Sequence, residues 1–310
     1  MDALSNLIHL ARPQASLELR CSLEGSFKVE HEPSDGANAP FHLVLSGGCL
    51  LKTENKSPIS LQAGDFILLP NGERHQILSD RSNAGSTRPI ILSNDGMLPL
   101  KSNGSGFPDV DLLCGSFSCP PGPARLLFRL MPDPVHVSLA ASQSASELHT
   151  LVTLIRNEAE SRKPGAMAIV TALSQALFTM ALRILSEDTS NKANSLALLC
   201  DPRLAPSIQA LLDQPGRPWT ITELGALAAM SRATYARHFV EKAGITVFEF
   251  LTEIRMTIAC GRLLETQRSA GDIGMDVGYQ SEAAFGRAFS QAVGMTPGRY
   301  RKHHRQQTGK

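Results

Sequence analysis

The spacing of apolar residues changes along the chain and predicts segments of different kinds. Residues 1–142 contain short apolar runs separated by Gly, Pro, Asn and Ser, which is typical of strands joined by tight turns. Residues 80–111 are loosely patterned, and we expect them to form a long mobile insertion. This first part of the chain is therefore predicted to be all-β. Its clearest strand candidates are residues 41–45 (followed by the turn 46–48), 66–69, 112–117 and 124–130.

The apolar period becomes helical after residue 144. Leu148, Leu151, Val152 and Ile155 fall on one helical face. A break at Pro164 and Gly165 precedes a second apolar face, made of Ile169, Leu173, Ala176, Leu177 and Met180. Two antiparallel helices joined by a short turn fit this pattern best. We expect residues 143–200 to be a helical linker, with a polar end at 186–195 and a possible role in homodimer formation.

The remaining residues, 201–310, carry a dense series of helix start signals. Thr220, Thr246 and Ser269 are each followed three residues later by an acidic residue, as in a capping box. Ser231 and Ser281 are further N-cap candidates, and Pro297 suits a first helical position. Seven helices are predicted, at about 204–213, 221–228, 231–243, 246–265, 270–277, 281–293 and 297–304.

Two of the predicted helix pairs repeat one pattern. Ser231 and Ser281 are 50 residues apart, and aromatic residues occupy the fourth and eighth positions after each serine. These aromatic side chains would face a core and leave the opposite face outward. Each unit matches a helix-turn-helix, whose second helix enters the major groove of DNA. We place the first motif at residues 221–243 and the second at 270–293.

The outward side chains are the candidates for contact with double-stranded DNA. The helix between the two motifs spans ~30 Å, close to one turn of the duplex, so both second helices can reach successive major grooves. Basic residues near the C-terminus, Arg299 and Arg301, are expected to hold phosphates. The candidate residues near the two helix starts are Ser231, Arg232, Thr234 and Arg237 in the first motif and Ser281, Glu282, Ala284 and Arg287 in the second.

The C-terminal residues also resemble a known family signature. The matching residues are Gly278, Tyr279, Ser281, Phe285, Arg287, Phe289, Gly294, Thr296, Pro297, Tyr300 and Arg301. In this order they resemble the AraC/XylS family, and the resemblance covers residues 204–305. It implies a bacterial transcription factor, usually an activator that also contacts RNA polymerase.

Composition and charge agree with this interpretation. Residues 201–310 hold 14 Lys and Arg against 10 Asp and Glu, an excess of four positive charges within a chain of net charge +1. A basic end suits a polyanionic partner. We find no membrane-spanning run and no secretory signal, so a cytoplasmic location is expected. Six cysteines in such a compartment are expected to be reduced thiols.

The N-terminal part resembles a cupin barrel in two places, FHLVLSGG at 41–48 and LQAGDFILLPNGERH at 61–75. Metal-binding cupins carry a His-x-His pair and a carboxylate in the first motif, whereas His42 stands there without them. His75 is the other well-placed imidazole, and two imidazoles do not complete a metal site. We therefore expect no metal and no cofactor, and interpret Phe41, His42 and His75 as pocket or core residues.

The chain as a whole resembles cupin-containing AraC-type regulators that sense reactive chlorine species. The shared segments are the opening MDALSNLIHLARPQ, Cys21, the GD-x-x-LLP segment and LLCGSF at 112–117. In that group redox sensing is assigned to the cysteines that Cys21 and Cys114 match. A thiolate can react with an electrophilic oxidant, and a second thiol can then form a disulfide. The resemblance implies that oxidation of these thiols switches DNA binding through the linker helices.

Two alternatives remain open at this point. The barrel can bind a small organic effector, such as an aldehyde, in a pocket lined by Phe41, His42 and His75. It can also be a cupin enzyme that works through a metal at the two histidines. We favour a regulator that is not an enzyme, with an α+β fold: an N-terminal cupin-like β-barrel, a helical linker pair and a C-terminal all-α domain with two helix-turn-helix motifs.

Overall fold

The computed structural model describes residues 2–34, 38–54, 56–80, 88–94, 97–119, 126–138, 145–161, 163–187 and 195–308. The chain divides into two compact units, each built from separate segments. The barrel unit comprises residues 14–118 and 132–184. The helical unit comprises residues 1–13, 119–131 and 185–310. The three-part division at residues 142 and 200 stays a prediction, and its first boundary lies outside the described residues.

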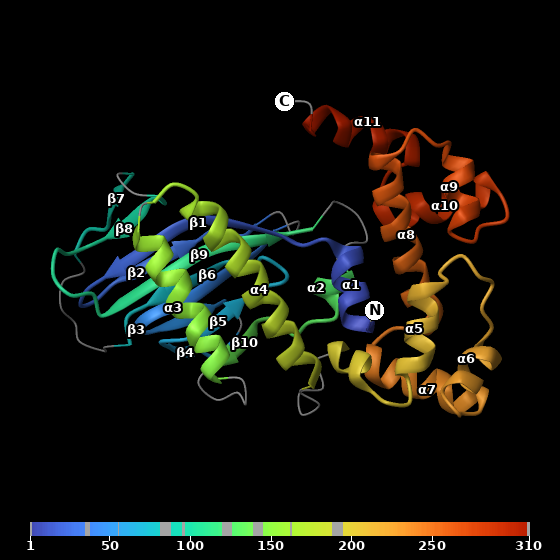
Figure 1. Cartoon of the computed structure of the whole chain (residues 1–310), viewed down its shortest axis with the longest axis horizontal. Helices are drawn as coiled ribbons and strands as arrows, with labels where there is room; N and C mark the ends of the chain where they lie inside the picture. Colours follow the sequence, from blue (N-terminus) through green and yellow to red (C-terminus); the bar gives the residue numbers. More distant parts are fainter. Residues whose placement is uncertain are drawn as a thin grey trace. The chain divides into compact units, whose positions relative to one another are not determined.

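The barrel unit is one curled, mostly antiparallel sheet (Figure 1). Its main path runs in the order β10-β5-β3-β9-β1-β8-β7, while β4 and β6 pair with β3, and β2 pairs with β6. The strands are β1 (Gln14–Leu23), β2 (Lys28–His31), β3 (Asn38–Thr53), β4 (Ile59–Gln62), β5 (Asp65–Leu68), β6 (His75–Leu78), β7 (Ile91–Ser93), β8 (Leu100–Ser102), β9 (Val110–Ser118) and β10 (Val135–Ser138). The predicted cupin-like barrel is confirmed.

One long strand makes the sheet curl. The expected turn at residues 46–48 is wrong, because β3 continues through it to Thr53. The pairing of β3 with β9 slips between Val44 and Ser46, and Gly47 lies in the left-handed region with φ 73°. A Cβ at Gly47 would lie 1.8 Å from the carbonyl oxygen of Asp109, so only glycine fits this bulge. The glycines therefore bend the strand instead of ending it.

Two further expectations for the barrel change. The strand expected at 124–130 is wrong, since residues Leu126–Arg129 form the short helix α2 and residues 124–125 lie outside the described part. Its consecutive apolar residues Leu126, Leu127 and Phe128 are all buried. A short apolar run without a clear period is compatible with either a strand or a helix. The expected insertion at 80–111 contributes the short strands β7 and β8, although residues 81–87 and 95–96 lie outside the described part.

Two helices complete the barrel unit, α3 (Ala145–Ser161) and α4 (Ala166–Glu187). The predicted face of α3 is buried, whereas Ile169 of the predicted α4 face is exposed. The buried residues of α4 lie about one position later in the sequence than the predicted face. Among them, Phe178 stacks on Phe117 of β9 with 4.2 Å between ring centroids. In the described part of the chain, α4 alone has the length and composition to cross a membrane. Its buried stripe shows that it packs as a core helix of this unit.

The seven helices predicted after residue 201 are all present. They are α5 (Ala205–Asp213), α6 (Ile221–Leu227), α7 (Arg232–Ala243), α8 (Val247–Glu265), α9 (Ala270–Asp276), α10 (Glu282–Val293) and α11 (Pro297–Thr308). Thr220 and Thr246 form complete capping boxes with Glu223 and Glu249. A short 3-10 helix, η2 (Ser195–Cys200), precedes them. The start signals were reliable because each is a local interaction between residues three apart.

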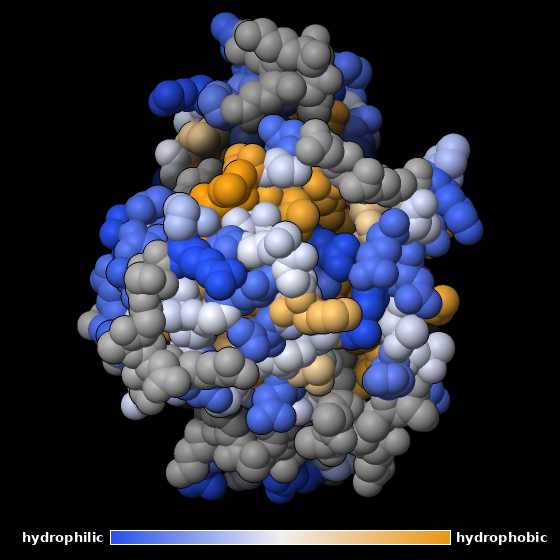
Figure 2. Space-filling view, turned by 90° about the vertical axis from the view of Figure 1, so that its left-hand side faces the viewer, coloured by the Kyte–Doolittle hydropathy of each residue, from blue (hydrophilic) through white to orange (hydrophobic). Residues whose placement is uncertain are grey.

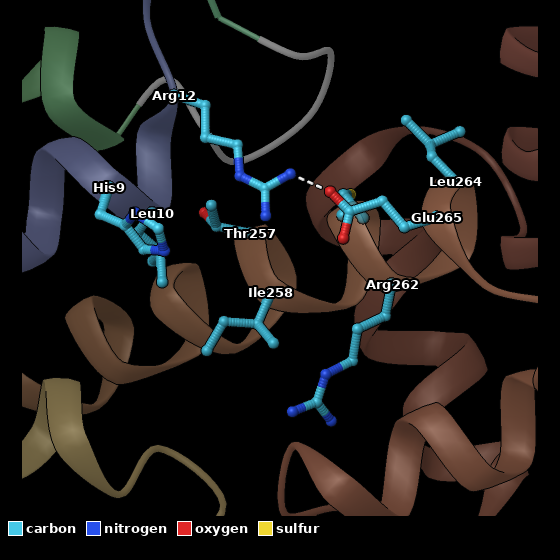
Figure 3. A pocket seen from close by; sticks show the side chains of 10 residues that line it. His9, Leu10, Arg12, Thr257, Ile258, Arg262, Leu264 and Glu265 are labelled. Atoms are coloured by element: carbon cyan, nitrogen blue, oxygen red, sulfur yellow. Dashed lines mark hydrogen bonds and ion pairs between the residues drawn. The ribbon is translucent and has the colours of Figure 1, made fainter.

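The helical unit also contains an N-terminal helix that the sequence did not predict. This helix, α1 (Ala3–Ala11), buries Leu7 and Ala11 and lies against α5 and α8. The side-chain amide of Asn6 donates to Asp213 of α5 at 3.3 Å. Arg12, just after α1, forms an ion pair with Glu265 at the end of α8 (Figure 3). The chain then enters β1 at Gln14, so α1 is covalently joined to the first strand of the barrel.

Candidate DNA-binding helices and a buried thiol–imidazole cluster

The first helix-turn-helix consists of α6 and α7. Ser231 caps α7 by accepting a hydrogen bond from the amide of Thr234 at 3.2 Å. Tyr235 and Phe239 are fully buried, and the Tyr235 hydroxyl donates to Ser207 of α5 at 3.0 Å. The aromatic positions thus hold α7 on the helical core, as the sequence pattern predicts. The opposite face of α7 is left in solvent.

The second helix-turn-helix consists of α9 and α10 and uses the same arrangement. Ser281 caps α10 by accepting from the amide of Ala284 at 3.2 Å. Phe285 and Phe289 are fully buried in a core shared with Tyr300 of α11. A Cβ at Gly274 of α9 would lie 2.7 Å from the Phe285 ring, so the two helices approach closely only because this residue is glycine.

The helix α8 separates the two motifs. It has 19 residues and is therefore ~28 Å long. In Figure 1, α7 lies near one end of α8 and α10 near the other. Both ends of α8 are buried in the cores of the motifs, through Phe250 and Ile254 on one side and Ala259 and Leu263 on the other. The spacer predicted from the sequence is thus a single helix with a length close to one turn of DNA.

Most of the residues proposed for DNA contact are exposed. On α7 these are Ser231, Arg232, Thr234 and Arg237, and on α10 Ser281, Glu282 and Arg287, whereas Ala284 is half-buried. The Arg237 side chain is 73% exposed and lies 3.8 Å from Glu241. Arg299 is also exposed, at the start of α11. Their roles in base and phosphate contact remain predictions.

Arg301 is placed differently from the other candidates. It is half-buried, and its guanidinium donates to the backbone carbonyls of Leu263, at 3.0 Å from Nε, and of Arg268. These carbonyls lie at and beyond the end of α8, so Arg301 fixes α11 to that helix. The structure therefore gives Arg301 a positioning role that the sequence did not predict. Arg268 pairs with Asp276 of α9.

Cys21 and Cys114 meet inside the barrel. Cys21 is in β1 and Cys114 in the adjacent strand β9, where Cys21 lies opposite Leu112 and Leu19 lies opposite Cys114. The two cysteines are therefore diagonal neighbours on one face of the sheet. Their thiols are hydrogen bonded to each other, and both side chains are almost fully buried. The structure thus brings together the two cysteines that the family resemblance selected.

The surroundings make Cys21 the more acidic thiol. The hydrogen bond from Cys114 is the largest influence and lowers the pKa of Cys21, while burial opposes it. The positive charge of Lys101, opposite Cys21 in β8, lowers the pKa further. The same bond and burial raise the pKa of Cys114. Arg20, which precedes Cys21 in the chain, is instead bound through its guanidinium to Asp111 and Glu160.

The remaining described thiols differ from this pair. Burial raises the pKa of Cys49, Cys119 and Cys260 to about 12 in each case. Cys200 is exposed at the end of η2. Buried thiols with a high pKa are poor nucleophiles. The contrast sets Cys21 apart chemically from the other buried cysteines.

The histidines form a cluster next to Cys114. His42 lies opposite Cys114 in the pairing of β3 with β9, and its Nδ1 is 3.0 Å from the Cys114 sulfur. Its Nε2 is 2.8 Å from Nε2 of His75, and Nδ1 of His75 donates to the carbonyl of Glu73 at 2.9 Å. His31 stacks on His75 with 4.7 Å between ring centroids. No sequence pattern pointed to His31, because it reaches the cluster only through the pairing of β2 with β6.

Phe41 does not belong to this cluster. Neighbouring residues in a strand point to opposite faces, so Phe41 packs against Phe66 and Phe117 on the other side of the sheet from His42. The proposed pocket lined jointly by Phe41, His42 and His75 is therefore wrong as a single site. The two histidines meet, and the phenylalanine is a core residue.

Comparison with known proteins agrees with both halves of the chain. Residues 2–187 match a cupin family and residues 224–303 a helix-turn-helix domain family. An HTH-type transcriptional regulator of Haemophilus influenzae is 33% identical over 97% of this chain and 99% of its own length. The RCS-specific HTH-type transcriptional activator RclR of Escherichia coli is 28% identical, with 99% of each chain covered.

A solved structure also resembles about a third of the chain. It is the DNA-binding domain of the global transcriptional factor AdpA in complex with a target DNA, with 26% identity, a TM-score of 0.33, and coverage of 34% of this chain and 95% of that one. The full-length relatives and the two matched families together identify the protein. The chain belongs to the AraC-type DNA-binding transcriptional regulators that carry an N-terminal cupin domain.

Proposed function

We propose that this regulator is switched by oxidation of the Cys21–Cys114 pair, with reactive chlorine species as the oxidant. The observation that carries the proposal is the placement of two buried thiols as diagonal neighbours on adjacent strands, one with a lowered pKa. The similarity to an activator described as RCS-specific supports the choice of oxidant. Local opening of the three-residue strand β8 beside Cys21 gives a small oxidant access to the thiol.

The chemistry needs one oxidant molecule for each pair. The Cys21 thiolate attacks the chlorine of hypochlorous acid, so that an S–Cl bond forms and hydroxide leaves. The Cys114 sulfur then attacks the Cys21 sulfur, an S–S bond forms, chloride leaves, and the Cys114 proton passes to the hydroxide to give water. Two electrons have moved from the thiols to chlorine. A thiol-based reductant reverses the change by disulfide exchange.

The register of the strands converts this bond into movement. Diagonal neighbours across an antiparallel pair have Cα atoms ~7–8 Å apart. A disulfide usually spans ~4.4–6.8 Å between Cα atoms. The bond therefore requires β1 to shift along β9, toward the position at which Leu19 now faces Cys114. The existing irregularity in this pairing, between Leu17 and Leu19, is a place where such a shift can be absorbed.

The N-terminal helix provides a route for the signal. A shift of β1 pulls on Pro13 and Arg12, which connect it to α1. α1 contacts α8, the spacer between the two DNA-binding motifs, and residues of both helices, among them His9 and Ile258, line a cavity of about 300 Å³ (Figure 3). The relay expected from the sequence runs instead through the linker helices at 144–187. The described contacts of α1 with α8 make the N-terminal connection the shorter path.

A reporter strain carrying the operator tests the proposal. Cys21→Ser should abolish induction by hypochlorous acid, and mass spectrometry of the wild type should show a Cys21–Cys114 linkage after mild oxidation. Cys49→Ser is the matched control, because Cys49 is buried in the same core with a pKa raised to about 12. Induction that survives Cys21→Ser, or that is lost equally in Cys49→Ser, would contradict the thiol switch.

Two further partners belong to the proposal, RNA polymerase and a second copy of the chain. Contact with RNA polymerase is implied by the family and is part of this proposal. For a homodimer, apolar side chains reach the surface of the barrel unit, including Leu154 of α3 and Ile169 of α4. On the face shown in Figure 2, apolar residues gather in one main patch among polar ones. The regulators among the relatives give no support to the alternative of a cupin enzyme.

A further inference from the structure

We propose that His31, His42 and His75 form a binding site for one divalent transition-metal ion, with Zn²⁺ as the best-suited probe. Each histidine offers one ring nitrogen, and the three nitrogens lie within 4.8 Å of one another. Three ligands around a tetrahedral ion with metal–nitrogen bonds of ~2.0–2.1 Å are ~3.4 Å apart. The nitrogen–nitrogen separations in the cluster fall on both sides of this value, so small rotations of the rings would bring the three nitrogens into position around one ion.

A buried nitrogen without a partner points to the same conclusion. Nε2 of His31 is buried and has no hydrogen-bond partner among the described residues. A buried polar atom normally has a partner, because leaving it unsatisfied costs ~1–3 kcal/mol. The two other imidazoles of the cluster lie against this ring, with centroid distances of 4.7 Å to the stacked His75 and 4.8 Å to the edge-on His42. A cation held jointly by the three rings would give this atom its missing partner.

One of the two proton arrangements open to His42 also favours a cation. The carbonyl oxygen of Glu73 can only accept, so Nδ1 of His75 carries hydrogen and the neutral ring has a bare lone pair on Nε2. When the Cys114 thiol donates to Cys21, Nδ1 of His42 must donate to the Cys114 sulfur. Nε2 of His42 is then also bare. Two lone pairs 2.8 Å apart repel each other unless a cation lies between them.

The donor set selects the class of metal. Imidazoles suit zinc, copper, nickel and iron, whereas magnesium and calcium prefer oxygen ligands. The rings must be neutral to bind, and burial lowers the pKa of His31 to about 3 and also lowers that of His42 and His75. Three protein ligands leave one position for water or a small molecule. The third ligand comes from β2, outside both cupin-like motifs, which explains why those motifs alone did not predict a site.

The site is linked to the proposed redox pair by one hydrogen bond. A metal on Nε2 of His42 leaves the ring proton on Nδ1, which then donates to the Cys114 sulfur. In that arrangement the Cys114 thiol is free to donate to Cys21. This linkage rests on the proposed thiol switch, whereas metal binding does not. Metal occupancy is therefore expected to speed the formation of the Cys21–Cys114 disulfide.

Calorimetric titration of the reduced, chelator-treated full chain with Zn²⁺ tests the site. One Zn²⁺ should bind per chain, and His31→Gln should weaken binding by at least about 100-fold, more than the loss of a typical outer-shell partner. His149→Gln is the control, because His149 is exposed on α3 and should bind as the wild type does. Circular dichroism without metal shows whether His31→Gln is folded; if it is not, His75→Gln takes its place.

Two results would overturn the metal site: no stoichiometric binding by the folded wild type, or equal affinities for His31→Gln and His149→Gln. The double variant Cys21→Ser/Cys114→Ser separates the two proposals. If this variant binds Zn²⁺ but gives no chlorine response, the metal site is supported independently of the cysteines. The single cysteine variants then decide the thiol switch. Equal disulfide rates with and without Zn²⁺ would overturn the linkage while leaving the metal site standing.

Discussion

The interiors of the two units hold different kinds of side chain. The core around α8 and α10 is apolar and aromatic, and its functional candidates lie on the outer faces of α7 and α10. The barrel unit instead buries two hydrogen-bonded thiols and a cluster of imidazoles. Burying polar groups costs stability unless they are well paired. Under the proposed function, the helical unit acts at its surface, while the barrel unit keeps its chemistry inside.

The largest expected effect on stability comes from truncating a core residue of the helical unit. Phe289→Ala should lower the free energy of unfolding by ~3–5 kcal/mol, because the ring is fully buried between Phe285 and Tyr300. Operator binding should be lost with it. Phe248→Ala is the control, since Phe248 of α8 is 41% exposed. Urea unfolding measures both, and equal effects would show that this core does not hold the motif together.

A pH titration tests the polar interior of the barrel. Burial holds the pKa of His31 at about 3, compared with 6.5 for an ordinary histidine. The unfolded chain therefore gains a proton below pH 6.5 while the folded chain does not, so stability is complete above pH 6.5 and is lost as the pH falls toward 3. At pH 5 the loss is ~2 kcal/mol for this histidine.

Urea unfolding between pH 7.5 and 5, in the presence of a chelator, measures this loss. His31→Gln should reduce the slope of stability against pH, since glutamine does not titrate. A variant that keeps the full wild-type slope would show that the loss comes from other groups.

Surface substitutions test the other side of the comparison. If Arg287 reads a base edge, Arg287→Ala should weaken operator binding by ~1–3 kcal/mol with little change in unfolding. Fluorescence anisotropy with operator and scrambled duplexes measures this loss and its sequence dependence. Gln291→Ala serves as the control, because Gln291 is an exposed residue of α10 one turn beyond Arg287. An equal loss on both duplexes would assign Arg287 to phosphate contact.

The smallest expected effect concerns the start of α8. Thr246→Ala removes the hydroxyl that accepts the amide of Glu249 at 3.2 Å, and should cost ~1 kcal/mol of stability. Thr246→Ser retains the hydroxyl and should cost much less. Thermal unfolding of the pair measures the difference. If the alanine and serine variants melt together, the cap adds nothing to the helix.

The local nature of caps explains which parts of the fold could be predicted from the sequence. Six of the seven helices after residue 201 were predicted from start signals that lie within one turn, whereas α5 has no side-chain cap. Helix α1 was missed, although Asp2 caps it by accepting from the amide of Ser5 at 2.9 Å. The pairing of Cys21 with Cys114 came from family resemblance, and no spacing rule supplied it.

The rest of the candidate site depends on contacts that are distant in the sequence. His31 meets His75 through a strand pairing across 44 positions, and Lys101 reaches Cys21 from a segment that looked like an insertion. Arg301 is part of the family signature, but the carbonyl groups that it contacts are determined by the packing of α11 against α8. Such contacts follow from the register of whole elements, which short patterns do not encode.

The interleaving of the chain limits how this regulator can be taken apart. The polypeptide passes between the two units four times, after residues 13, 118, 131 and 184. A fragment starting near residue 195 would retain both DNA-binding motifs but lose α1, leaving the partners of Leu7 and Ala11 uncovered. Recombination that exchanges the sensor by a single crossover would exchange α1 with it, and so separate α1 from the helices that it covers. Modular evolution of such proteins therefore has to preserve or replace this short N-terminal helix together with the helices that it covers.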